Sequence, residues 1–193
     1  MKKLTAGAIA VAATALMAGT AQAQLPTITP FAFEARAGVA LPTGDMNEDT
    51  GPGLALSGSV TYHAIPLIGI YAGGSYARFS ADLEDDVEGH ATDTGFDVGA
   101  RIGIPTPLIP IDPWIKAGLV VHRISLSDDD VSIDSDWGTG YEVGAGLGFG
   151  FGPVSISPGV SYVRYNSDFG DVGEDEEFTV SYIRADIGVR IRI

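Results

Sequence analysis

The chain has 193 residues, no cysteine, 45% hydrophobic residues and a formal net charge of -14 at pH 7. The lack of cysteine excludes a disulfide scaffold, a thiolate metal site and a lipid-modified N-terminal cysteine. The isoelectric point near 4.3 argues against nucleic-acid binding, which requires a basic face.

Residues 1–23 have the composition of a secretory signal peptide. Two lysines follow the initial methionine, residues 4–17 form an apolar, alanine-rich run, and the tripeptide AQA ends the segment. We expect cleavage before Gln24, which leaves residues 24–193 as one mature domain. An uncleaved anchor is the alternative, but the apolar run is short for a membrane-spanning helix of about 20 residues.

The rest of the chain alternates apolar residues with polar or small ones, which is the period of a β-strand. The alternation is least regular in the third such segment, residues 68 to about 79, which suggests a bulge near Arg78. A tilted strand that crosses a bilayer needs about 9–11 residues, and each segment reaches that length. The eight segments are Phe31–Leu41, Leu54–Ala64, Ile68 to about Phe79, Gly95–Ile104, Trp114–Ile124, Tyr141–Phe151, Val154–Tyr165 and Phe178–Ile193.

The two faces of these segments differ in a way that indicates a membrane. One face is continuously apolar, whereas the other carries Glu, Arg, Asp, Lys, Ser and Gly. The pattern predicts an all-β protein: an eight-stranded antiparallel up-and-down transmembrane β-barrel with its apolar face toward lipid. The barrel must close, because unpaired strand edges cannot face hydrocarbon. A soluble periplasmic barrel is the alternative.

The connectors also alternate. Those after even segments are short and contain proline, whereas those after odd segments are long and hold most of the 25 acidic residues. Outer-membrane barrels have short periplasmic turns and longer outer loops, so we expect periplasmic termini and acidic extracellular loops in a Gram-negative outer membrane. The long connectors are about Pro42–Gly53, Ser80–Thr94, Ser125–Gly140 and Asn166–Glu177.

Aromatic residues fall near both ends of the segments. Trp114 and Phe151 lie toward the short-turn end, and Trp137 and Tyr141 lie toward the long-loop end. We expect these rings to form belts at the two interfaces between lipid and water.

The chain resembles the small eight-stranded outer-membrane barrels of the opacity-protein, OmpA-like and OmpX-like superfamily. The likeness covers the mature chain, and its most specific motif is the C-terminal assembly signal, which Asp186, Gly188, Ile191 and Ile193 match in order. Ile193 stands where the family usually has an aromatic residue. The resemblance implies recognition by the barrel-assembly machinery through these four residues.

The sequence offers no catalytic constellation. Its histidines are His63, His90 and His122. Ser125 is close to His122 in sequence, but an odd separation on a strand places the two on opposite faces. We therefore expect no enzymatic activity and no cofactor.

Charged residues on the inward face form a candidate network. Acids and bases nearly balance there, as expected in a narrow interior where an unpaired charge is costly. We interpret the set as structural filling, with a narrow gated conduit as the alternative. Its members are Glu34, Arg36, Asp97, Arg101, Lys116, Glu142, Arg184, Asp186 and Arg190.

The acidic connectors could bind divalent cations. Asp128, Asp129, Asp130, Asp134 and Asp136 form an oxygen-rich cluster of the kind that Ca²⁺ accepts, although no loop has the EF-hand order. A solvated acidic surface is the default interpretation, and cation binding that bridges to lipid phosphates is the hypothesis beside it.

Together these features predict an outer-membrane barrel with a structural or surface-interaction role and no catalysis. The alternative is a narrow porin-like channel for ions or small apolar solutes. The expected partners are outer-membrane lipid and lipopolysaccharide, the assembly machinery and divalent cations, but no nucleic acid. We expect a monomer.

Overall fold

The computed structural model describes residues 30–47, 50–65, 67–83, 87–106, 111–127, 132–167 and 178–193. The predicted signal peptide lies outside these ranges. The elements are β1 (Phe31–Pro42), η2 (Gly44–Asn47), β2 (Thr50–Ile65), β3 (Ile68–Leu83), β4 (Val87–Gly103), β5 (Asp112–Ser127), β6 (Ser132–Asp134), β7 (Gly138–Phe151), β8 (Val154–Ser167) and β9 (Phe178–Arg192).

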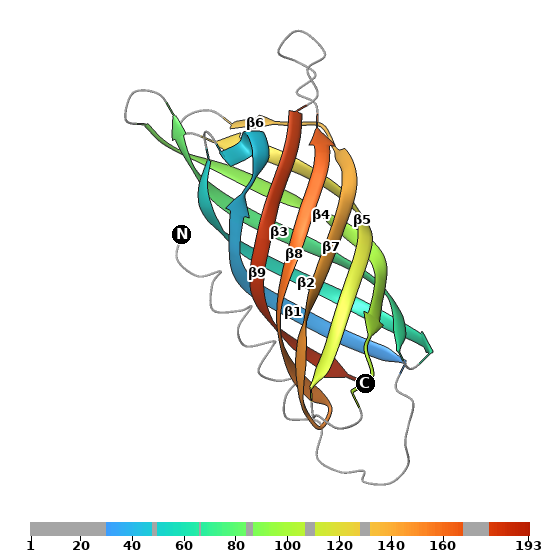
Figure 1. The fold of residues 1–193 in the computed structure, drawn as a ribbon. Helices are drawn as coiled ribbons and strands as arrows, with labels where there is room; N and C mark the ends of the chain where they lie inside the picture. The colour runs from blue at the N-terminus through green and yellow to red at the C-terminus, as the bar shows by residue number, and fades with distance from the viewer. Residues whose placement is uncertain are drawn as a thin grey trace, which may run out of the picture.

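Eight of these strands close into an antiparallel barrel (Figure 1). Apart from β6, strands that follow one another in the chain pair with each other, so that β4 pairs with β5 and β5 pairs with β7. The ring closes where β1 pairs with β9, with Phe33 opposite Ile191. The short β6 pairs with the end of β5 and adds no member to the ring. The predicted eight-stranded up-and-down topology is confirmed.

The strand alternation separates an apolar outer wall from a polar interior. Phe96 and Leu119 are each 66% exposed, whereas their chain neighbours Asp97 and Val120 are buried. Because successive side chains leave opposite faces of a strand, this order extends around the barrel. Among the described residues, no helix is long and apolar enough to cross a membrane.

Several strands run further than their composition suggested. β3 continues to Leu83 and β4 begins at Val87, so most of the expected acidic connector 80–94 is strand. The acidic residues had indicated a loop, but the alternation in this stretch continues. The expected bulge near Arg78 is wrong, since Arg78 pairs regularly on both sides. The irregularities lie in β2, between Thr50 and Gly53 and near its other end.

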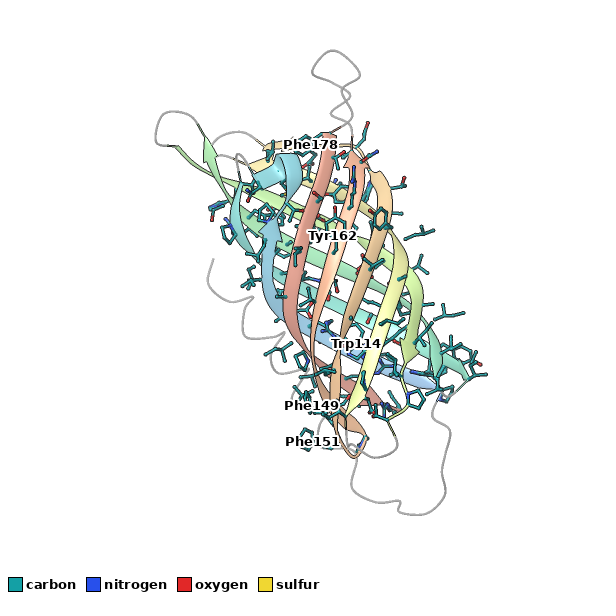
Figure 2. All side chains as sticks on the ribbon, viewed as in Figure 1. Trp114, Phe149, Phe151, Tyr162 and Phe178 are labelled. Carbon is teal, nitrogen blue, oxygen red and sulfur yellow. The ribbon has the colours of Figure 1, made fainter. Side chains whose placement is uncertain are left out.

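The barrel has two distinct ends, which we call the short-turn end and the long-loop end. The turn between β7 and β8 marks the first, and Gly152 adopts a positive φ of 67° there, which glycine tolerates best. Phe149 and Phe151 lie at this end, whereas Phe178 lies at the long-loop end with η2 and β6 (Figures 1 and 2). The C-terminus lies on the short-turn side (Figure 1).

Candidate functional site in the barrel interior

Glu34 is the ion-pair centre of the short-turn half of the barrel. It points inward from β1 because it follows the lipid-facing Phe33. Its Oε2 lies 2.6 Å from Arg101 Nη1 and 3.6 Å from Arg190 Nη1, and its Oε1 pairs with Arg36. Three guanidinium groups therefore share one carboxylate.

Arg36 connects Glu34 to the middle of the barrel. Its Nε donates to Asp186 Oδ1 at 2.8 Å, and its Nη2 donates to the backbone oxygen of Ser157 at 2.9 Å. Asp186 Oδ2 lies 3.2 Å from Arg184 Nε. Gly188 leaves room for these groups, since a Cβ there would lie 2.7 Å from Arg36 Nη1. Ion pairs therefore continue from β1 to β9.

Glu142 is the centre of the next group. Its side chain is fully buried, and its Oε2 lies 2.7 Å from Lys116 Nζ and 3.3 Å from Arg184 Nη2. Tyr71 donates its hydroxyl proton to Glu142 Oε1 at 2.6 Å. Charge-assisted hydrogen bonds of this kind offset the cost of burying the carboxylate.

The structure brings eight of the nine expected interior charges into one network of ion pairs, and Asp97 lies in a separate group. The network has five bases and three acids, so it carries an excess of positive charge. Its members are Glu34, Arg36, Arg101, Lys116, Glu142, Arg184, Asp186 and Arg190.

Asp97 belongs to a second buried group, centred on His122. His122 is opposite Gly95 in the pairing of β4 with β5, and its ring occupies the space that a side chain at Gly95 would need. The ring consequently lies between two aspartates of β4: Nδ1 is 2.8 Å from Asp93 Oδ1, and Nε2 is 2.9 Å from Asp97 Oδ1. An imidazolium carries a proton on each nitrogen and so matches both carboxylates.

Two further hydroxyls complete the His122 group. Tyr165 donates to Asp93 Oδ2 at 3.0 Å, and Ser75 Oγ lies 3.1 Å from His122 Nε2. Asp93 falls within the expected connector 80–94, but the structure buries it in β4. The sequence could have placed Asp93 inside, because Ala91, Asp93 and Asp97 are separated by even numbers of residues and so lie on the same face of the strand.

The contacts of Ser75, His122 and Asp93 have the connectivity of a nucleophile, a base and an orienting acid. However, His122 Nε2 also faces Asp97, at a shorter distance than it faces Ser75. The imidazole has no exposed surface. This geometry favours the stabilisation of buried charge over nucleophilic catalysis.

Trp114 corrects an expectation about the interfacial belts. Its side chain is 3% exposed and points into the barrel, where Nε1 donates to Ser157 Oγ at 2.9 Å. The guanidinium of Arg101 lies 4.1 Å from the ring centroid, and that of Arg36 lies 5.1 Å from it. Trp114 and Lys116 are two residues apart on one strand, so the alternation already predicts that Trp114 faces inward. Figure 2 marks Trp114 in the short-turn half.

An apolar cluster fills the interior toward the long-loop end. Phe79 and Tyr182 pack edge to face with ring centroids 5.4 Å apart, and η2 buries Met46 against the same cluster. Its other members include Ala40, Ala55, Ala77, Ala91, Val120, Ile124, Val163, Tyr165 and Val180.

The interior cavities are unequal. A cavity of about 30 Å³ lies within the ion-pair network, beside Glu34, Tyr71 and Glu142, and could hold about one or two water molecules. A larger one of about 400 Å³ opens at the short-turn end, beside Arg101 and Arg190. Side chains therefore fill much of the described interior, as expected for eight strands.

The remaining expected residues are only partly described. Asp134 and Asp136 are exposed, whereas Asp128, Asp129 and Asp130 lie outside the described residues. Within the described part of the chain, no group of three or more histidine or acidic side chains is placed to hold a metal. The calcium hypothesis therefore stays a prediction.

The C-terminal motif contains both inward-facing and outward-facing residues. Asp186 and Gly188 point inward, whereas Ile193 is exposed. Gly188 has a packing role beside Arg36, so interior packing is enough to account for a glycine at this position.

Comparison with known proteins identifies the class of fold. The profile of the outer membrane protein beta-barrel domain family matches residues 8–182. A search of curated proteins found no match.

Solved structures share this fold at low sequence identity. Neisserial surface protein A (NspA) is 20% identical with a TM-score of 0.61, covering 85% of this chain and 97% of that one. OprG from Pseudomonas aeruginosa is 11% identical with a TM-score of 0.51, covering 86% and 98%. Ail, the attachment invasion locus protein of Yersinia pestis, is 15% identical with a TM-score of 0.50, covering 83% and 97%.

Proposed function

The chain belongs to the outer membrane protein beta-barrel domain family, and from this premise we propose that it is a closed, non-catalytic barrel with a structural or surface-interaction role. The observation that carries the proposal is the filled interior. Eight linked charges occupy its short-turn half and middle, and an apolar cluster occupies the long-loop half. A hydrated conduit would need polar, water-accessible walls along its whole length, and the apolar cluster is a poor wall of that kind.

The outer wall supports residence in lipid. Exposed apolar side chains alternate with buried polar ones along the strands. Arg78 and Arg164 are exposed in the long-loop halves of β3 and β8. We propose that they contact phosphates of lipopolysaccharide, that the long acidic connectors are extracellular, and that divalent cations bridge acidic residues to those phosphates.

The surface role is the finer part of the proposal. Two structural neighbours are named as a surface protein and an attachment invasion locus protein. At this level of identity they share the fold, and we extend the surface role to this chain as an inference. Assembly through Asp186, Gly188, Ile191 and Ile193 and a monomeric state complete the proposal.

Single cysteines test the orientation cleanly, because the chain contains none of its own. Asn47 is exposed at the long-loop end, and Pro153 is exposed in the turn between β7 and β8. In intact cells, a membrane-impermeant maleimide should label Asn47→Cys and leave Pro153→Cys unlabelled. Permeabilising the outer membrane should make both sites reactive. Labelling of Pro153→Cys alone in intact cells would reverse the proposed orientation.

Conductance separates the closed barrel from the narrow pore. In planar bilayers we expect the folded protein to give no discrete current steps, because ion pairs and the apolar cluster block the interior. A known porin in the same bilayer serves as the positive control, and heat-modifiable gel migration verifies that the barrel is folded. Reproducible steps whose frequency rises with the amount of protein would support the pore instead.

A further inference from the structure

The cavity at the short-turn end has a cationic wall. It has a volume of about 400 Å³, and Arg101, Arg190 and Arg192 line it beside His63 and Trp114. Among the described lining residues, Asp112 is the acidic one. Three of the 11 basic residues of a chain with a net charge of -14 therefore line this one cavity.

These arginines are incompletely neutralised. Arg101 and Arg190 share the single carboxylate of Glu34, which Arg36 also contacts. Arg192 relies on Asp112, at 3.6 Å, and both of these side chains are about half exposed. The linked interior network has five bases and three acids, and this cavity is where it meets solvent. Asp93 and Asp97, the other buried acids that the structure describes, contact His122.

Arg190 is only loosely paired with the shared carboxylate. It is 4% exposed, its Nε has no hydrogen-bond partner among the described residues, and its contact with Glu34 is 3.6 Å. Its Nη2 lies 2.8 Å from His63 Nε2. Because a guanidinium only donates, this contact requires the neutral ring with its proton on Nδ1. A neutral histidine adds no negative charge to the site.

We propose that the cavity at the short-turn end binds a phosphate-bearing anion, held by Arg190, Arg192 and Arg101. Guanidinium groups match the geometry of phosphate oxygens and bind them with paired hydrogen bonds. The bound charge would offset the excess positive charge of the network. The phosphate could come from a free phosphate compound or from a phospholipid headgroup.

The test uses Trp114, which lines the cavity. In a Trp137→Phe background Trp114 is the sole tryptophan, since the chain has two. The folded barrel in maltoside micelles is titrated with inorganic phosphate and, separately, with micelles that contain phosphatidic acid. We expect a saturable change in Trp114 fluorescence in at least one titration, and the responding titration identifies the source.

Two charge variants give opposite expectations. Arg192→Gln should weaken binding by roughly fivefold to tenfold, because it removes one of the paired donors. Asp112→Asn should strengthen binding severalfold, because it removes the competing carboxylate. Arg123→Gln is the matched control, since Arg123 is about as exposed as Arg192 and pairs with the exposed Asp134. Its affinity should stay unchanged.

Three results would overturn the proposal. The first is the absence of a saturable response to either phosphate source. The second is an equal response to chloride at the same ionic strength, which would show general screening. The third is an equal effect of Arg192→Gln and Arg123→Gln. Heat-modifiable migration confirms that each variant is folded, and the result is independent of whether the barrel conducts.

Discussion

Replacing Glu142 with glutamine should lower the free energy of unfolding by about 3–5 kcal/mol, as expected when one partner of a buried ion pair is removed. The amide keeps the size of the side chain and can still accept from Tyr71, but it loses the negative charge that faces Lys116 and Arg184. Urea unfolding in lysolipid micelles, followed by tryptophan fluorescence, measures the change.

Two companion variants distinguish lost charge pairing from a general loss of packing. Adding Lys116→Met to Glu142→Gln removes a stranded cation and should recover about half of the lost stability, because contacting residues do not act additively. Asp134→Asn removes one partner of an exposed ion pair and should change stability by less than about 0.5 kcal/mol. Equal losses in Glu142→Gln and Asp134→Asn would contradict the role assigned to burial.

The orientation of side chains was predictable because a strand has a period of two. A shift of one residue would turn Phe96 inward and Asp97 toward lipid, so the hydrophobic pattern specifies which face is which. The same rule put Glu34, Glu142 and Arg184 inside, where the structure has them. Local alternation therefore carries most of the information about the wall.

The positions of strand ends were less predictable, since acidic composition and strand alternation conflict there. Asp93 looked like a loop residue among other acids, yet it is buried in β4. Its cost of burial is offset by His122, a residue of the next strand, which composition alone does not reveal. The prediction for Trp114 was wrong for a related reason. Tryptophan is common at membrane interfaces, but the even-numbered position of Trp114 in its strand places it inside the barrel.

The partners of the interior side chains could not be predicted at all. Tyr71 and Glu142 are 71 residues apart in the chain, and Ser75 and His122 are 47 apart. Their contacts depend on the tilt and stagger of the whole barrel. Residues on one inward face can therefore be grouped from sequence, but the division into a Glu34–Glu142 network and a separate His122 group requires the structure.

Replacing His122 with leucine should have a comparable effect on stability, about 3–5 kcal/mol. Leucine fills much of the ring volume, but it leaves Asp93 and Asp97 in the interior without the cation between them. Tyr165 still donates to Asp93 and Ser75 still donates to Asp97, so each carboxylate keeps one hydroxyl donor but no cation. The same urea unfolding experiment reports the loss.

Changing a carboxylate shows whether stability is lost because the two acids have no cation between them or because the ring no longer packs. Adding Asp97→Asn to His122→Leu removes one buried negative charge and should recover part of the stability. His90→Leu, at a half-buried position of β4 with the opposite parity to Asp93, should change stability by less than about 0.5 kcal/mol. If Asp97→Asn brings no recovery, the ring acts through its volume. Recovery would show that the two carboxylates make a cation necessary at this position, and hence why a histidine lies opposite Gly95.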